Sequence, residues 1–113
     1  MIAGEIYLAN FPFGGSPGTK LRPVLLLSGK VGPVPEVLTA YISSAIPARL
    51  LPSDLIVDPS SPEHLSTNLK VKSILRLHKL ATLHERVFVR RLGQISPATQ
   101  QTIHVKLRML LGL

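Results

Sequence analysis

The sequence predicts a small α+β domain that is mostly β, built as a twisted β-barrel closed by one C-terminal helix. Two observations predict this class. Short apolar or alternating segments recur up to residue 95, separated by glycine- and proline-rich segments, as is typical of strands joined by turns. A longer segment with helical spacing follows only after residue 95. The length of 113 residues fits a single domain spanning residues 1–113.

Five or six short strands are expected before the helix. Gly4–Phe11 alternates with the period of two of a half-buried strand, whereas Val24–Leu27 is a continuous apolar run typical of a central strand. Between them, Phe11–Lys20 is rich in glycine and proline and is expected to be a mobile loop. Further strands are expected at Val37–Ser43, Leu55–Val57, Lys70–Leu80 and Arg86–Ile95, with Gly93 as a bulge or close-packing point.

Alternation in Lys70–Leu80 predicts two distinct faces. One face should carry Val71, Ser73, Leu75 and Leu77, and the other Lys72, Ile74, Arg76 and His78. After the last strand, Ser96-Pro97 is a helix start, because serine caps helices and proline is tolerated in the first turn. The helix should present an apolar face to the barrel or to a partner and end at a glycine, as indicated by Ile103, Leu107, Leu110, Leu111 and Gly112.

Positive charge is concentrated in the C-terminal part of the chain. The formal net charge is +7, and residues 70–113 hold nine basic residues against one acidic residue. Such a one-signed field indicates a polyanion or an acidic protein as partner. The alternative is a charge that only keeps the protein dispersed.

The composition excludes several kinds of site. The chain has no cysteine, which excludes a disulfide scaffold, a thiol nucleophile and a zinc ribbon. The four histidines lack metal-ligand spacing and the six acids are scattered, so no metal, cofactor or carboxylate pair is expected. The glycine-rich segment Gly14–Lys20 lacks the spacing of a phosphate-binding loop. We see no transmembrane segment and no signal peptide, so a cytoplasmic protein without membrane contact is expected.

Cationic and hydroxyl side chains remain as candidates for binding or catalysis. Lys20 and Arg22 lie where the loop meets a strand, and Ser43 and Ser44 lie where another strand ends. A guanidinium matches phosphate oxygens, and a serine hydroxyl both donates and accepts. RNA brings its own nucleophile, the 2′-hydroxyl, so a protein needs only to align it, stabilise charge and manage protons. The alternative is structural: Arg22 starts a strand and the two serines form a turn.

Four segments form an ordered pattern along the chain. They combine a glycine-acid-hydrophobic start, an Arg-Pro strand that ends in serine, and two later blocks: Gly4–Phe13, Lys20–Ser28, Ser73–Leu83 and Arg90–Ser96. In this order, and covering about residues 3–111, they resemble the MazF/PemK family of bacterial toxins from type II toxin–antitoxin pairs. The resemblance implies an SH3-like β-barrel with a C-terminal helix, usually as a homodimer.

The resemblance also implies an activity. It implies a metal-independent, sequence-specific endoribonuclease that cuts single-stranded RNA such as mRNA and leaves a 2′,3′-cyclic phosphate and a 5′-hydroxyl. It further implies a cognate antitoxin whose acidic, partly disordered segment blocks the RNA groove. RNA and the acidic antitoxin segment would each suit the positive charge of residues 70–113.

The resemblance assigns a catalytic pair. Arg22 matches the arginine of the family's Arg-Pro motif, and Ser43 matches the threonine or serine after the third strand. Arg22 would stabilise the phosphorane or transfer a proton, although arginine is an awkward base because its side chain stays protonated in proteins. Ser43 would hydrogen-bond the phosphate and orient the 2′-hydroxyl. RNA contacts are expected from Thr19, Lys20, Ser44, Arg76, His78 and Lys79.

The chain departs from the family pattern in three places. Leu21 stands where some members have histidine, the preceding loop has no acid, and Ser43 lacks the methyl group that restricts a threonine rotamer. Each departure leaves the fold intact and bears on the cutting rate. His78 is a proton carrier near neutral pH or a partly exposed strand histidine.

Other classes of function stay open. One is a non-catalytic member of the same fold that binds nucleic acid or an antitoxin, or that poisons DNA gyrase through its C-terminal helix. Another is an SH3-like module for acidic peptides. The pair Arg22 and Ser43 favours the ribonuclease, because a pure binding protein would not need it.

Overall fold

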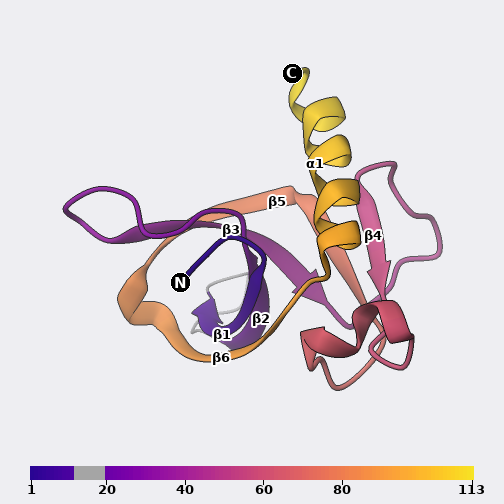
Figure 1. Ribbon diagram of the computed structural model, residues 1–113, viewed down its shortest axis with the longest axis horizontal. Coiled ribbons are helices and arrows are strands. Elements are labelled where there is room, and N and C mark those ends of the chain that lie inside the picture. The colour runs from indigo at the N-terminus through magenta and orange to yellow at the C-terminus, as the bar shows by residue number, and fades with distance from the viewer. Residues whose placement is uncertain (12–19) are drawn as a thin grey trace.

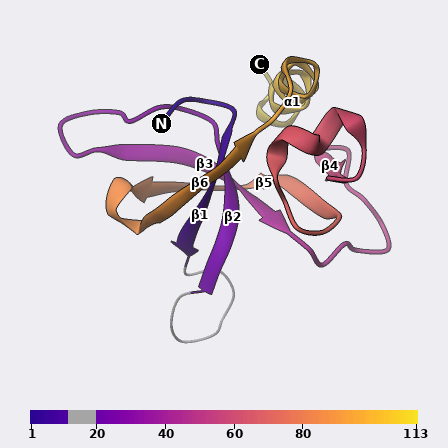
Figure 2. The same cartoon turned by 60° about the horizontal axis from the view of Figure 1, so that its bottom comes forward.

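The computed structural model describes residues 1–11 and 20–113, which form one antiparallel sheet and a C-terminal helix (Figure 1). The six strands lie in the order β4-β5-β3-β2-β1-β6. The mostly β class with a final helix is therefore confirmed. Among the described residues β4 and β6 are the two edges and do not pair, so the sheet is twisted but not closed into a barrel (Figure 2). The elements are β1 Glu5–Phe11, β2 Lys20–Leu26, β3 Glu36–Ser43, β4 Asp54–Val57, η1 Pro62–Thr67, β5 Ser73–His84, η2 Glu85–Val87, β6 Phe88–Gln94 and α1 Pro97–Leu111.

Every expected strand exists, but some boundaries differ from the sequence prediction. β2 already begins at Lys20, which pairs with Phe11, so Lys20 belongs to a strand and not to the loop. The rest of the loop expected over Phe11–Lys20, residues 12–19, lies outside the described residues. The 3-10 helix η1 was not expected, because the prolines around it were read only as strand breakers. Its proline stands at the start, where a missing N–H costs nothing.

The long strand β5 contains a bulge that the alternation pattern did not reveal. Ala40 pairs with Leu80 while Tyr41 pairs with Arg76, so β5 carries extra residues at this point. The two-face prediction for this strand is therefore wrong in part. Val71 lies before the strand and is 55% exposed, and Ile74 is fully buried on the face expected to be polar.

The main core lies between one face of the sheet and the first half of α1. A smaller cluster of Ala9, Val24 and Leu83 lies on the other side of the strands. Because burying a large aliphatic side chain contributes about 1.5–3 kcal/mol, the main core supplies most of the apolar stabilisation. Its buried members are Ile6, Leu25, Ala40, Ile42, Val57, Leu69, Leu75, Leu77, Ile95 and Ile103.

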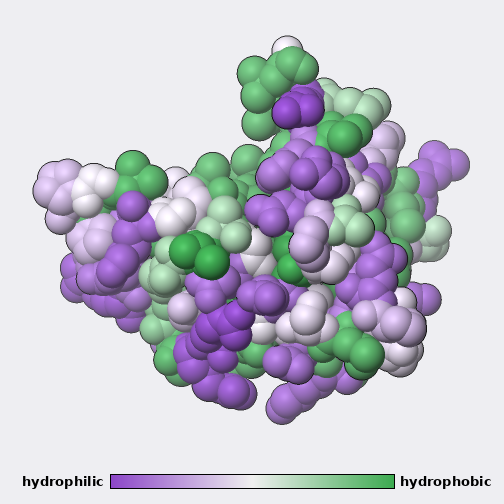
Figure 3. Space-filling model, in the orientation of Figure 1, coloured by the Kyte–Doolittle hydropathy of each residue, from purple (hydrophilic) through white to green (hydrophobic). Residues whose placement is uncertain are grey.

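The helix α1 packs against the sheet up to Leu107, whereas its last turn is exposed. Ser96 caps it by accepting a hydrogen bond from the backbone N–H of Thr99, and Gly112 ends it with a φ of 71°. Ile103 is buried, whereas Met109 and Leu111 are 75% and 54% exposed. The helix end projects from the sheet and carries hydrophobic side chains (Figures 1 and 3). No helix within the described ranges is long and apolar enough to cross a membrane.

Candidate functional site

Arg22 on β2 and Ser43 on β3 belong to neighbouring strands of the sheet. The β2–β3 register pairs Val24 with Tyr41 and Leu25 with Ala40. The pairing ends at Val24 and Tyr41, and Arg22 and Ser43 each lie two residues beyond this last pair, at the same end of the two antiparallel strands. The two residues that the Arg-Pro motif and the serine corner single out thus lie at one end of two neighbouring strands.

The Ser43 hydroxyl is held by its own backbone turn. Its Oγ accepts a hydrogen bond from the backbone N–H of Ala45 at 3.0 Å, and Ser43 is 8% exposed. A hydroxyl has one donor and two acceptor positions, so this contact leaves the O–H group able to donate. The hydrogen bond restricts the rotamer of the Ser43 side chain.

A groove of about 590 Å³ opens beside this pair. Ser44 is exposed and lines the groove, whereas Ser43 does not. Apolar side chains make up much of the lining, and Arg22, Lys70 and Arg90 supply positive charge. The residues that line this groove, called the Arg22 groove below, are Leu8, Leu21, Arg22, Pro23, Ile42, Ser44, Asn68, Leu69, Lys70, Val71, Ser73, Arg90 and Leu92.

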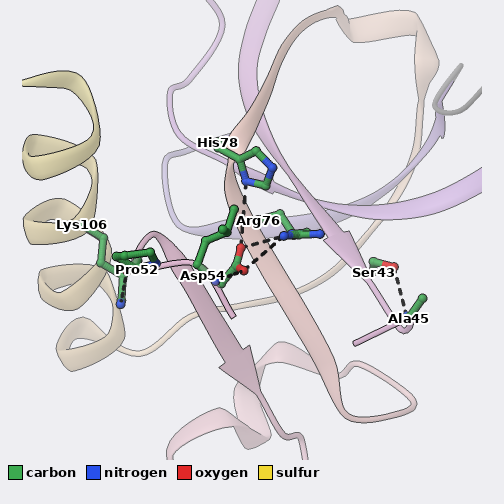
Figure 4. A network of polar contacts seen from close by, with 8 residues as sticks. Ser43, Ala45, Pro52, Asp54, Arg76, His78 and Lys106 are labelled. Carbon is green, nitrogen blue, oxygen red and sulfur yellow. Dashed lines mark hydrogen bonds and ion pairs between the residues drawn. The ribbon is translucent and has the colours of Figure 1, made fainter. Parts of the chain in front are cut away.

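A second polar group, the Asp54 cluster, consists of Asp54, Arg76 and His78 (Figure 4). Arg76 donates from Nε to Oδ1 of Asp54 at 3.1 Å and from Nη2 to Oδ2 at 3.2 Å. His78 Nδ1 lies 4.0 Å from Oδ1. Strand pairing explains the arrangement, because Asp54 on β4 is directly opposite Arg76 on β5. On the opposite side of β5 from Asp54, Tyr41 of β3 pairs with Arg76. The Asp54 cluster therefore lies level with Tyr41, two residues along β3 from Ser43.

The surroundings of Asp54 favour the charged form of its carboxyl group. Burial raises its pKa, but hydrogen bonds from the backbone N–H of Leu51 and from Arg76, together with the positive charge of Arg76, outweigh burial and leave the pKa below its ordinary value. Asp54 therefore stays ionised at neutral pH and keeps Arg76 paired.

The remaining predicted RNA contacts fall in different places. Lys20 is exposed at the start of β2, and the ammonium of Lys79 lies 5.4 Å from the ring centre of Tyr41. Thr19 lies outside the described residues. Arg76 and His78 belong to the Asp54 cluster and do not line the Arg22 groove.

Sequence reasoning missed three charged residues that the fold brings to these sites. Asp54 was read as one of several scattered acids, because separation along the chain says nothing about which strands pair. Lys70 and Arg90 counted only as part of a basic segment, and both line the Arg22 groove. Across the described part of the chain, no three His, Asp or Glu side chains lie close enough to hold a metal ion.

Solved structures share the fold across nearly the whole chain. An endoribonuclease in complex with its cognate antitoxin from a mycobacterial species is 21% identical with a TM-score of 0.73, covering 100% of this chain and 96% of that chain. The Mycobacterium tuberculosis toxin MazF-mt6 is 19% identical with a TM-score of 0.74, covering 96% of this chain and 97% of that chain. At these identities the likeness shows the fold.

The sequence itself supplies the assignment. Among curated proteins, none matches this chain closely enough to count as a relative. The family model of PemK-like, MazF-like toxins of type II toxin–antitoxin systems matches residues 2–111. The resemblance in the four ordered segments is thereby confirmed, and the chain belongs to the PemK-like, MazF-like family of type II toxins.

Proposed function

We propose that this chain is a toxin that acts as a sequence-specific endoribonuclease on single-stranded RNA without a metal ion. The observation that carries the proposal is the placement of Arg22 and Ser43 at the same end of the neighbouring strands β2 and β3, where Arg22 lines a groove with further cationic side chains. Family membership and the fold shared with proteins named as endoribonucleases support it.

The proposed reaction uses the substrate's own nucleophile. The 2′-oxygen forms a bond to phosphorus and loses its proton, the bond to the 5′-oxygen breaks, and that oxygen gains a proton. The products are a 2′,3′-cyclic phosphate and a 5′-hydroxyl. The Arg22 guanidinium would donate hydrogen bonds to the phosphorane oxygens, where charge develops, and so lower the barrier.

Ser43 would act as an oriented donor. Its oxygen is already engaged by the Ala45 N–H, so its O–H can point to a phosphate oxygen without a search among rotamers. Ser44, exposed in the Arg22 groove, would bind the substrate and take no part in the chemical step.

The proposed partners follow from the same surface. Arg22, Lys70 and Arg90 give the groove a positive rim, which suits RNA and also an acidic antitoxin segment. A structure of the same fold holds its cognate antitoxin, which supports a cognate antitoxin here. We also propose that the toxin acts in the cytoplasm as a homodimer, as the family resemblance implies.

The first test is cleavage of a long, unstructured RNA by purified protein in excess EDTA. The wild-type protein should give discrete cuts that end in a cyclic phosphate. Arg22→Ala should cut at least about 100-fold more slowly, because it removes a donor to the developing charge. Arg108→Ala, an exposed arginine at the end of α1, is the matched control and should cut normally. A folded wild-type protein that leaves several RNAs intact would favour the non-catalytic or gyrase-poison alternative.

Substitutions of Ser43 and Ser44 should affect different kinetic parameters of cleavage. Ser43→Ala should lower kcat about tenfold or more with little change in KM, whereas Ser44→Ala should mainly raise KM. The measurement is the steady-state cleavage rate of a short RNA that contains one cut site. The reverse pattern would move the catalytic role from Ser43 to Ser44.

A further inference from the structure

We propose that Asp54 is a positioning residue that fixes the Arg76 guanidinium so that it can bind the RNA backbone beside the Arg22–Ser43 pair. The inference rests on the proposed ribonuclease function. Asp54 itself would touch no substrate, because its side chain is fully buried.

The geometry of the pair is that of a rigid clamp. Both carboxylate oxygens accept from Arg76, at 3.1 and 3.2 Å, in the two-point arrangement that fixes a guanidinium plane. The carboxylate is itself anchored, because Oδ2 also accepts from the backbone N–H of Leu51 at 2.8 Å. Asp54 lies on the short edge strand β4, so pairing with β5 holds the backbone that carries this carboxylate.

The clamp leaves Arg76 able to bind a second anion. A guanidinium has five N–H donors, and Asp54 takes two of them. The side chain of Arg76 is 19% exposed, so part of it reaches solvent. Figure 4 shows the carboxylate of Asp54 facing both Arg76 and His78.

The position of Arg76 suits a contact with the same strand of RNA. Arg76 is opposite Tyr41, and Tyr41 is opposite Val24, two residues from Arg22. With a strand spacing of about 4.8 Å, the backbone positions of Val24 and Arg76 are about 10 Å apart in one row across the sheet, and Arg22 lies two residues further along β2. An extended single strand that places one phosphate at Arg22 can therefore place a neighbouring phosphate near Arg76.

Simple charge counting predicts the opposite effect for Asp54, and this makes the inference testable. Removing a negative charge from a protein that binds a polyanion should tighten binding. A positioning role predicts weaker binding when Asp54 becomes Asn, because Arg76 loses its fixed orientation. A purely structural role predicts lower stability with no specific loss of RNA affinity.

The experiment measures RNA affinity in a double-mutant cycle. The probe is a 2′-O-methyl RNA, which cannot be cut, with the sequence that the wild-type protein cleaves, or of mixed sequence if it cleaves none. Arg76→Ala should weaken binding about tenfold, the loss expected for one charge-assisted hydrogen bond to phosphate. Asp54→Asn should weaken it about fivefold in the wild-type background and not at all in the Arg76→Ala background.

A second substitution keeps the test independent of folding defects. Arg76→Lys retains the charge but cannot form the two-point contact, so it should bind RNA as weakly as the Asp54→Asn variant. All variants are compared below their melting temperatures, as measured by circular dichroism. Unchanged or tighter binding by Asp54→Asn, or an equal loss in both backgrounds, would overturn the inference.

The outcomes also separate this inference from the proposed function. A wild-type protein that binds the RNA but does not cleave unmodified RNA refutes the proposed function, and the cycle still decides the role of Asp54. A protein that cleaves RNA but shows no coupling between Asp54 and Arg76 refutes only this inference. A protein that neither binds nor cleaves RNA refutes both.

Discussion

At the scale of single residues, the buried charge of Asp54 ties the stability of the protein to pH. Its pKa is held below the ordinary value, so its ion pair stabilises the folded state at neutral pH, and this contribution is lost as the pH falls through the lowered pKa. We expect the stability gap between wild type and Asp54→Asn to narrow between about pH 5 and about pH 2.

Urea unfolding at a series of pH values checks this expectation. The matched control is Asp58→Asn, because the pKa of Asp58 is also lowered, by hydrogen bonds from Ser60, but at an exposed position where solvent screens the charge. Its gap from wild type should change much less with pH. Parallel curves for wild type and Asp54→Asn would show that the ion pair does not contribute in this way.

The sequence predicted residues that sit in local motifs and missed those defined by strand pairing. Arg22 stands in an Arg-Pro motif and Ser43 at a strand end, so both could be singled out by neighbours in the chain. Asp54 meets Arg76 only because β4 and β5 pair in one register. A shift of one residue would turn Asp54 to the other face, and nothing in its local sequence fixes that register.

At the scale of elements, Gly93 controls how closely β6 approaches the 3-10 helix η1. A Cβ atom at this position would lie 2.2 Å from the carbonyl oxygen of Ser66 and 2.7 Å from that of Thr67. These are backbone atoms, which cannot rotate away. The sequence prediction of a close-packing point at Gly93 is thus confirmed, and a register shift lies beside it in the β1–β6 pairing.

Gly93→Ala should therefore destabilise the fold. We expect a loss of about 2 kcal/mol, which is typical of overpacking against a rigid neighbour. In a domain of this size that corresponds to roughly 10 °C in melting temperature. Val89→Ala, on the same strand at a position that is 53% exposed, is the control and should melt close to wild type. An unchanged melting temperature for Gly93→Ala would mean that η1 moves aside at little cost.

Strands were predictable from period and composition, but the bulge in β5 was not. Alternation is a property of one strand, whereas a bulge is a mismatch between two strands, seen here where Ala40 pairs with Leu80 and Tyr41 with Arg76. Arg76 and His78 nevertheless stay on the same side, as alternation predicts, because both face the carboxylate of Asp54. The end of α1 shows the same limit, since helical spacing predicted an apolar face but not that its last turns would project beyond the sheet.

At the scale of the whole molecule, positive charge should make the affinity for RNA depend on the salt concentration. Each lysine that contacts a phosphate contributes to the slope of log affinity against log salt, by about 0.7 for single strands. Lys20→Ala should reduce this slope by about that amount and weaken binding to all sequences alike. Lys30→Ala is the control, because Lys30 pairs with Glu85 at 3.3 Å. An altered sequence preference with an unchanged slope would contradict a phosphate contact at Lys20.

Some of the positively charged side chains lie on an edge strand of the sheet, where they also oppose pairing with another molecule. An unpaired strand edge invites the edge of another molecule, and short strands and charged side chains are the usual defence against such aggregation. β4 is only four residues long, and β6 carries Arg90 and Arg91 along its length. Arg90 also lines the Arg22 groove, so one side chain serves both solubility and the presentation of positive charge. A substitution of Arg90 would therefore change both the charge of the groove and the charge that protects this edge of the sheet.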